Sequence, residues 1–151
     1  MTRTLEQDIA GLLRASSEAV SARVYEGLAE AGFSDIRPAH ENVFSYISPD
    51  GTRIVDLAER AGIRKQSMGY LVDDPYILGY VELLPDERDG RAKRVRLTEK
   101  GRGAKRVRQA ALEEIEAEYS GLLGAGRMNE LRGSLEAVVH SIAPDGSRWP
   151  E

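Results

Sequence analysis

The chain has 151 residues, of which 41% are hydrophobic, and this is enough for one domain with a sizeable core. It contains no cysteine, which excludes disulfides, zinc–thiolate sites and thiol-based redox sensing. The net charge of −4 argues at first against a nucleic-acid ligand, but the charge is unevenly spread. Residues 64–108 carry 12 basic and 7 acidic side chains, net +5, against 6 and 10 in residues 1–63 and 3 and 8 in residues 109–151. Local positive charge of this kind is what steers DNA binding.

Residues 4–31 predict a long amphipathic helix, because apolar side chains recur at spacings of three and four. They are Leu5, Ile9, Leu12, Leu13, Val20, Val24 and Leu28. A second helix is expected over residues 38–48, after Pro38. It contains His40 and Phe44, which either line a pocket for a small effector molecule or are ordinary helix residues. The two histidines, His40 and His140, lie far apart with no cysteine near them, so a metal site is not expected.

Two short helices separated by a turn are predicted next. In residues 53–62, Ile54, Leu57 and Ala61 share one helical face, and Gly62 stops the helix. Residues 65–72 place Met68, Leu71 and Val72 on one face and leave Lys65, Gln66, Gly69 and Tyr70 elsewhere. This pattern is typical of a helix-turn-helix, in which the second helix enters the major groove of DNA.

A basic β-hairpin is expected after these helices. The apolar run from Tyr80 to Leu84 is followed by a turn rich in Pro, Asp and Gly, and then by Lys93 to Leu97, where apolar and basic residues alternate. A small hairpin edged with arginine and lysine is poorly suited to a core and well suited to a phosphate backbone. A helix-turn-helix followed by such a hairpin is a winged helix.

Two more long helices are predicted over residues 98–123, with Thr98 as N-cap, and residues 127–142. Gly121, Gly124 and Gly126 indicate a bend between them. The apolar stripes of these helices and of residues 4–31 are longer than one small winged domain can cover. We therefore expect residues 4–31 and 98–142 to form a homodimer; the alternative is a monomeric helical bundle.

The sequence resembles the MarR family of bacterial transcriptional regulators. The resemblance is carried by VDLAERAGIRKQSMGYLVDD (55–74) and LGYVELLPDERDGRAKRVRLTEKG (78–101), together with the flanking long helices, and covers roughly residues 5–142. It implies one MarR-like domain over residues 1–151, mainly α with a small β-hairpin wing. Residues 38–97 would form a winged helix-turn-helix DNA-binding lobe, flanked by the dimerisation helices.

The predicted DNA-binding residues fall in two groups. The recognition helix contributes Arg64, Lys65, Gln66, Ser67, Gly69 and Tyr70, and the wing contributes Arg88, Asp89, Arg91, Lys93 and Arg94. Asp89-Gly90-Arg91 matches the family's Asp-x-Arg motif, which implies that Asp89 orients the wing and Arg91 enters the minor groove. Lys93 and Arg94 are expected to contact phosphates or remain solvated. For Gln66, adenine contact and simple exposure both stay open, as do phosphate contact and packing for Tyr70.

The chain departs from the family pattern at two positions. Pro75 stands where a leucine would continue the recognition helix, and proline removes a helical hydrogen bond and clashes with the preceding turn, so we expect the helix to end or kink there. Arg64 stands where Ser, Thr or Asp would usually cap the helix.

The most economical function is a sequence-specific, double-stranded-DNA-binding transcriptional regulator, acting as a ligand-responsive dimeric repressor on a pseudo-palindromic operator. The alternative is a winged-helix protein–protein module that does not bind DNA. No catalytic constellation or nucleotide motif is present, so neither enzymatic activity nor a cofactor is expected. The chain has no long apolar run and no signal-peptide pattern, so we expect a cytoplasmic protein with no membrane contact.

Overall fold

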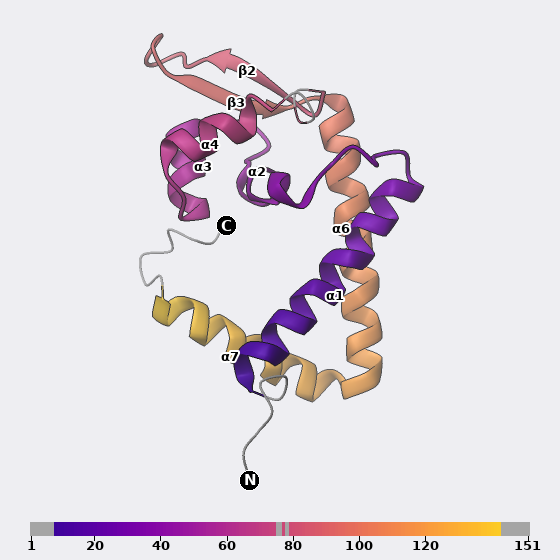
Figure 1. The fold of residues 1–151 in the computed structure, drawn as a ribbon. Coiled ribbons are helices and arrows are strands. Elements are labelled where there is room, and N and C mark those ends of the chain that lie inside the picture. The colour runs from indigo at the N-terminus through magenta and orange to yellow at the C-terminus, as the bar shows by residue number, and fades with distance from the viewer. Residues whose placement is uncertain (1–7, 75–76, 78, 143–151) are drawn as a thin grey trace.

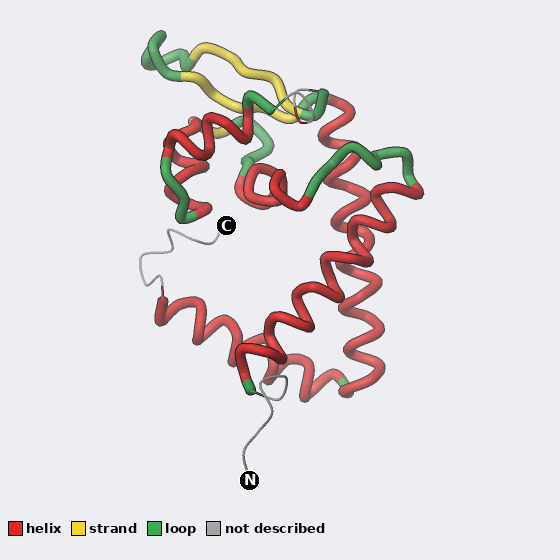
Figure 2. The backbone as a smooth tube through the Cα atoms, viewed as in Figure 1, coloured by secondary structure: helices red, strands yellow, loops and turns green. Residues whose placement is uncertain are grey.

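The computed structural model describes residues 8–74, 77 and 79–142. Figure 1 shows two parts. One is a lobe that contains the short helices and a small sheet, and the other consists of three long helices. Figure 2 shows the same path by secondary structure, with helix predominating and strand confined to one edge of the lobe. The expected class, mainly α with a small β wing, is confirmed.

The lobe is built from η2 (Pro38–His40), α2 (Glu41–Tyr46), β1 (Thr52–Arg53), α3 (Ile54–Ala61), α4 (Lys65–Val72), β2 (Val81–Pro85) and β3 (Lys93–Leu97). The three strands form an antiparallel sheet in the order β1-β3-β2. Val81 pairs with Leu97 and Pro85 with Lys93, which confirms the predicted hairpin. The two-residue strand β1 was not predicted, because two residues carry no periodic signal; Thr52 pairs with Val95.

The helix-turn-helix is also confirmed. α3 ends at Gly62, whose φ of 65° is the left-handed conformation that glycine adopts without strain. α4 ends at Val72 and does not continue into Asp74, as expected for a helix followed by proline. Pro75 itself lies outside the described residues. Leu57, Met68 and Val72 are fully buried between the two helices and the rest of the lobe, so the turn is held by a shared core.

The long helices are α1 (Ile9–Glu30), α6 (Glu99–Leu123) and α7 (Ala125–Ile142). α1 and α6 lie side by side, and α7 turns back from the far end of α6 (Figure 1). Residues 4–7 of the predicted first helix lie outside the described residues. The bend between α6 and α7 is at Gly124, with φ of 83°, whereas Gly121 and Gly126 lie within the helices.

The N-terminal end of α6 is held closely against the wing. One residue, Thr98, separates β3 from α6, and its hydroxyl accepts from Gly101 N at 3.1 Å, which confirms the predicted N-cap. The same hydroxyl donates to the Gly79 carbonyl at 2.8 Å, and Thr98 N donates to Tyr80 O at 2.9 Å. A Cβ at position 101 would lie 2.0 Å from the Tyr80 carbonyl oxygen, so only glycine fits at this contact.

The main core lies inside the lobe and continues along the first half of α6. Among the residues that the structure describes, seventeen apolar ones are buried, and most belong to the lobe or to its contacts with α1 and α6. The remaining surfaces of the long helices are open. Ile9, Leu12 and Leu13 of α1 are 70%, 53% and 43% exposed, and α7 has no buried residue at all.

Candidate nucleic-acid interface

The outward face of α4 is polar and open. Met68 and Val72 point into the core, which turns the opposite face, with Gln66 and Tyr70, toward solvent. Tyr70 is 70% exposed. The predicted contact residues Arg64, Lys65 and Ser67 are exposed as well, and Gly69 is half-buried. Arg64 occupies the N-cap position, but its guanidinium forms no capping hydrogen bond with the start of α4.

Gln66 and Tyr70 are linked to each other, one helical turn apart. The Gln66 amide Nε2 donates to the Tyr70 hydroxyl at 3.3 Å. The pair borders a shallow groove of 460 Å³ between the start of α3 and the length of α4. The hydrogen bond restricts both exposed side chains in part, which lowers the side-chain freedom that a contact would cost.

Asp86 organises the turn of the wing. It is buried, and its carboxylate accepts from the backbone N–H of Arg88 at 2.8 Å and of Asp89 at 3.3 Å. Arg53 Nε lies 2.8 Å from the other carboxylate oxygen; its N–H direction does not satisfy a hydrogen bond, so the contact is an ion pair. The Arg88 amide, together with the Arg53 charge, holds the pKa of Asp86 below its ordinary value although burial opposes ionisation.

Asp89 lies where an orienting residue of the tip is needed. Its carboxylate accepts from the backbone N–H of Arg91 at 3.1 Å and lies 3.8 Å from Arg53 Nη2. Arg53 therefore contacts two carboxylates of the same turn. Neither Arg53 nor Asp86 was among the predicted site residues. The sequence shows Asp86 in the turn, directly after Pro85. Arg53, which pairs with it, lies two helices and a strand earlier in the chain, so the pairing could not be predicted.

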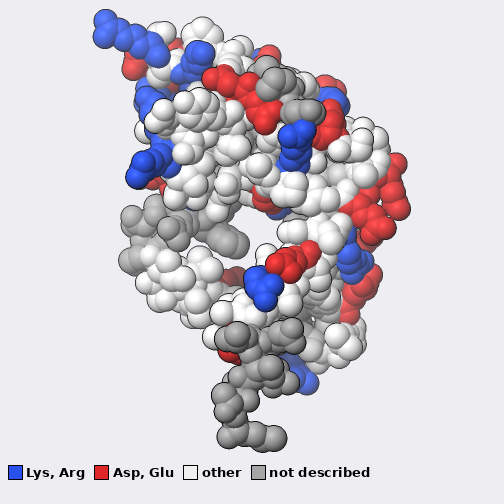
Figure 3. Space-filling model, viewed as in Figure 1, with Lys and Arg blue, Asp and Glu red and all other residues white. Residues whose placement is uncertain are grey.

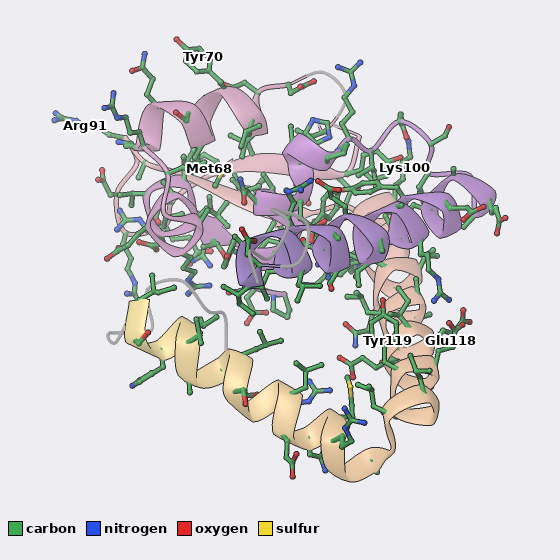
Figure 4. All side chains as sticks on the ribbon, turned by 60° about the horizontal axis from the view of Figure 1, so that its bottom comes forward. Met68, Tyr70, Arg91, Lys100, Glu118 and Tyr119 are labelled. Atoms are coloured by element: carbon green, nitrogen blue, oxygen red, sulfur yellow. The ribbon has the colours of Figure 1, made fainter. Side chains whose placement is uncertain are left out.

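The cations of the wing tip are available for a ligand. Arg88, Arg91 and Lys93 are exposed, and none of them forms an ion pair with any other part of the chain that the structure describes. In Figure 4, Arg91 on the wing and Tyr70 on α4 both point away from the long helices, while Met68 lies inside the lobe. The hairpin tip and α4 thus present their polar groups outward from one lobe.

Arg94 and Arg96 are engaged within the protein. Arg94 Nη2 donates to the carbonyls of Asp50 at 3.2 Å and Gly51 at 2.9 Å, which ties the loop before β1 to the wing. Arg96 pairs with Glu82 across the hairpin at 2.8 Å. Arg94 therefore shapes the wing, and its predicted contact with a phosphate stays a prediction.

His40 and Phe44 are buried in the core of the lobe, with 0% and 3% of their surface exposed. His40 Nδ1 accepts from Arg37 N at 3.2 Å, and its Nε2 lies 3.3 Å from Asp74 Oδ2, so both ring nitrogens have partners. Phe44 packs edge to face on Tyr80, with ring centroids 5.9 Å apart. The interpretation of His40 and Phe44 as effector contacts stays a prediction.

A partly buried polar cluster joins the lobe to the long helices. Glu41 of α2 pairs with Arg108 of α6 and accepts from Ser45 at 2.8 Å and from Tyr25 of α1 at 3.3 Å. Burial opposes ionisation of Glu41, yet Arg108 and the two hydroxyl donors hold the pKa of that carboxyl below its ordinary value. Burial, and then the Glu41 charge, raise the pKa of Tyr25. This cluster connects α1, α2 and α6 through polar side chains.

Figure 3 shows how the charges are distributed on one face of the molecule. Lysine and arginine gather at the hairpin tip and the neighbouring edge of the lobe, whereas acidic side chains gather along the α1 and α6 side. On the face drawn, the hairpin tip and the adjoining edge of the lobe are predominantly basic, although acidic side chains also lie over the sheet. No described helix combines the length and apolar character required to cross a bilayer.

Comparison with solved structures identifies the fold. CouR bound to a 23-mer DNA duplex, described as a transcriptional repressor, superposes with a TM-score of 0.70 at 19% identity, covering 92% of this chain and 99% of that one. A MarR-family transcriptional regulator from Rhodococcus sp. RHA1 gives 0.68 at 22% identity, covering 91% and 96%. This chain has the MarR fold.

Other MarR-fold structures were solved with small molecules. CouR from Rhodococcus jostii RHA1 bound to p-coumaroyl-CoA matches with a TM-score of 0.68 at 23% identity, over 91% of this chain and 95% of that one. No model of a known protein family matches the sequence, and a search of curated proteins finds no match either. The superpositions confirm the fold that the MarR resemblance implied.

Proposed function

We propose that the protein is a sequence-specific, double-stranded-DNA-binding transcriptional regulator that acts as a homodimer. The observation that carries the proposal is the open polar surface of the lobe. α4 presents Gln66 and Tyr70 outward, and the wing presents exposed cations that include Arg91. The same fold is bound to a DNA duplex in the CouR structure.

Each part of the surface has its own task in this mechanism. α4 enters the major groove, where Gln66 meets base edges, and Lys65, Ser67 and Tyr70 hold the helix through phosphates. Arg91, placed at the tip by the Asp86 and Asp89 contacts, enters the adjacent minor groove. The cations at the tip set the salt dependence of binding, because each neutralised phosphate releases a counterion.

The dimer is the second part of the proposal. The exposed apolar side chains of α1 and α7 include Leu12, Leu13, Leu131, Leu135 and Val138, at 53%, 43%, 43%, 40% and 52% exposure. A single chain leaves this surface in water, whereas a second copy would cover it. Two reading helices in a two-fold dimer would fall about 34 Å apart, matching the half-sites of a pseudo-palindrome.

Regulation is the third part. With no cysteine to oxidise, we propose repression that is released by a bound small molecule. A ligand near the Glu41–Arg108–Tyr25 cluster would contact α1, α2 and α6 together. At this cluster, α2 of the lobe is joined to the long helices α1 and α6. It would change the separation of the two reading helices only through its different affinity for the two arrangements.

Selection of bound sequences from a random duplex pool tests the proposal. We expect enrichment of one pseudo-palindromic sequence, a binding stoichiometry of two chains per duplex, and an affinity that falls steeply as salt is raised. If no sequence is enriched and no duplex binds at low salt, the proposal is wrong, and a winged-helix module for protein partners becomes the better hypothesis.

A further inference from the structure

Gly69 occupies the interior of α4, where glycine weakens a helix relative to alanine. Its backbone does not require glycine, because its φ is not positive. Nor does packing require it: a Cβ built at position 69 would have no neighbour within 4 Å among the described residues. The fold of the single chain therefore gives no reason for the missing side chain.

The surroundings of Gly69 suggest a reason outside the chain. The groove beside it is lined by Ile54, Lys65, Gln66, Gly69, Tyr70 and Asp73. The hydrogen-bonded Gln66 and Tyr70 side chains form one border, and Ile54 supplies an apolar surface from α3. Gly69 contributes only backbone and Cα to the lining, so it leaves an open, partly apolar recess on the surface of the proposed reading helix.

We propose that this recess receives the C5-methyl group of a thymine, and that Gly69 is a specificity-determining residue because it leaves room for that methyl. The proposal rests on the proposed function, in which α4 lies in the major groove. There, the thymine C5-methyl is the one methyl group on the base edges, beside hydrogen-bond donors, acceptors and the smaller C5–H of cytosine. An apolar recess flanked by polar side chains matches this combination.

The test couples a change in the protein with a change in the DNA. In the duplex selected by the full-length protein, each thymine is replaced in turn by deoxyuridine, which lacks only the methyl group. We expect one position per half-site where the parent protein loses about fourfold in affinity, the value of one buried methyl group. At every other thymine in the recognised half-site, the replacement is expected to change affinity less.

Gly69→Ala should then separate stability from recognition. Its Tm should rise, because alanine favours the helix and meets no neighbour. Its affinity for the thymine duplex should fall at least about fivefold, because the added methyl occupies the same space. On the duplex with deoxyuridine at the sensitive position, the parent and variant should differ less.

The outcomes distinguish the inference from the function on which it rests. If the parent enriches no duplex, the proposed function itself is wrong and the inference falls with it. If the parent binds its duplex but Gly69→Ala loses the same factor on thymine and deoxyuridine duplexes, the recess serves some other group and the inference is overturned. A lower Tm for Gly69→Ala would also overturn it, because it would reveal an internal need for glycine. Methyl-dependent loss together with a raised Tm supports it.

Discussion

The winged lobe and the long helices treat their apolar side chains in opposite ways. In the lobe, Leu57, Met68 and Val72 are fully buried, and short elements from distant parts of the chain close around one core. On α7, no residue is buried, and Leu131, Leu135 and Val138 are exposed. The lobe buries its apolar side chains within one chain, whereas the long helices leave many of theirs exposed to solvent in the single chain.

This difference separates two kinds of stability. Side chains buried within one chain stabilise the fold at any protein concentration. Surface buried between two copies stabilises the fold only to the extent that the copies associate, so that contribution depends on protein concentration. The comparison can be broken or sharpened by changing one region at a time.

The largest effect is expected from Leu131→Asp combined with Leu135→Asp in α7. In a two-fold dimer, four leucines at about 1.5–3 kcal/mol each would be lost from the interface, roughly 6–12 kcal/mol in all. We expect sedimentation to change from a dimer to a monomer at micromolar concentration. Asn129→Asp, on the polar side of the same helix, is the matched control and should leave the dimer intact. A parent protein that sediments as a monomer would contradict the contrast drawn between the two regions.

Leu57→Ala should act within the lobe. Leu57 is fully buried in α3, and loss of a buried leucine costs about 2–5 kcal/mol of unfolding free energy. Val55, on the same helix but 44% exposed, provides the control, and Val55→Ala should cost well under 1 kcal/mol. Chemical denaturation at two protein concentrations measures both. A loss for Leu57→Ala that vanishes at high concentration would show that the lobe also depends on association.

Arg91→Ala should weaken DNA binding more than any other single wing substitution, by about 1–3 kcal/mol on the specific site. Arg91 is exposed at the tip and its backbone is held by Asp89. Lys93→Ala should cost less, and equally on specific and random duplexes, because a phosphate contact carries no sequence information. Titrations at one fixed salt concentration compare them. Unchanged affinity of Arg91→Ala for the specific site would remove the wing from the mechanism.

The smallest effect concerns the order of the wing as pH falls. Asp86 has a folded-state pKa below its ordinary value near 4. Its stabilising contribution is therefore complete above the unfolded pKa and is lost as pH falls through the lower folded pKa. We expect the amides of Arg88 and Asp89 to lose hydrogen-exchange protection in that acidic range, before the lobe unfolds. Asp86→Asn should lack the acid transition, and an identical transition in that variant would assign it to another group.

Local signals account for most of what could be predicted from the sequence. The helices followed from apolar spacing, the end of α3 from Gly62, the start of α6 from Thr98, and the hairpin from alternation around a Pro/Asp/Gly turn. Each of these features is decided by residues that are close together in the chain. The outward polar face of α4 followed in the same way, because Met68 and Val72 had to point inward.

The parts that could not be predicted depend on contacts between distant residues. The pairing of Arg53 with Asp86 joins β1 to the wing turn, and nothing near either residue indicates the other. Arg94 was expected to contact a phosphate or remain solvated, and its donation to two carbonyls of the loop before β1 was not foreseen. His40 likewise gained two partners, Arg37 and Asp74, that its own helix pattern did not reveal.

The single residue between β3 and α6 has a mechanical consequence. Thr98 forms hydrogen bonds through its backbone and its side chain, and Gly101 lies in close contact with the Tyr80 carbonyl. The connection between β3 and α6 is therefore rigid. The hairpin and α6 should therefore behave as one rigid lever, with the wing tip at one end and the bend at Gly124 at the other. A small tilt at the far end of α6 would then be delivered to the wing as a displacement of its tip, undiminished by any flexible linker.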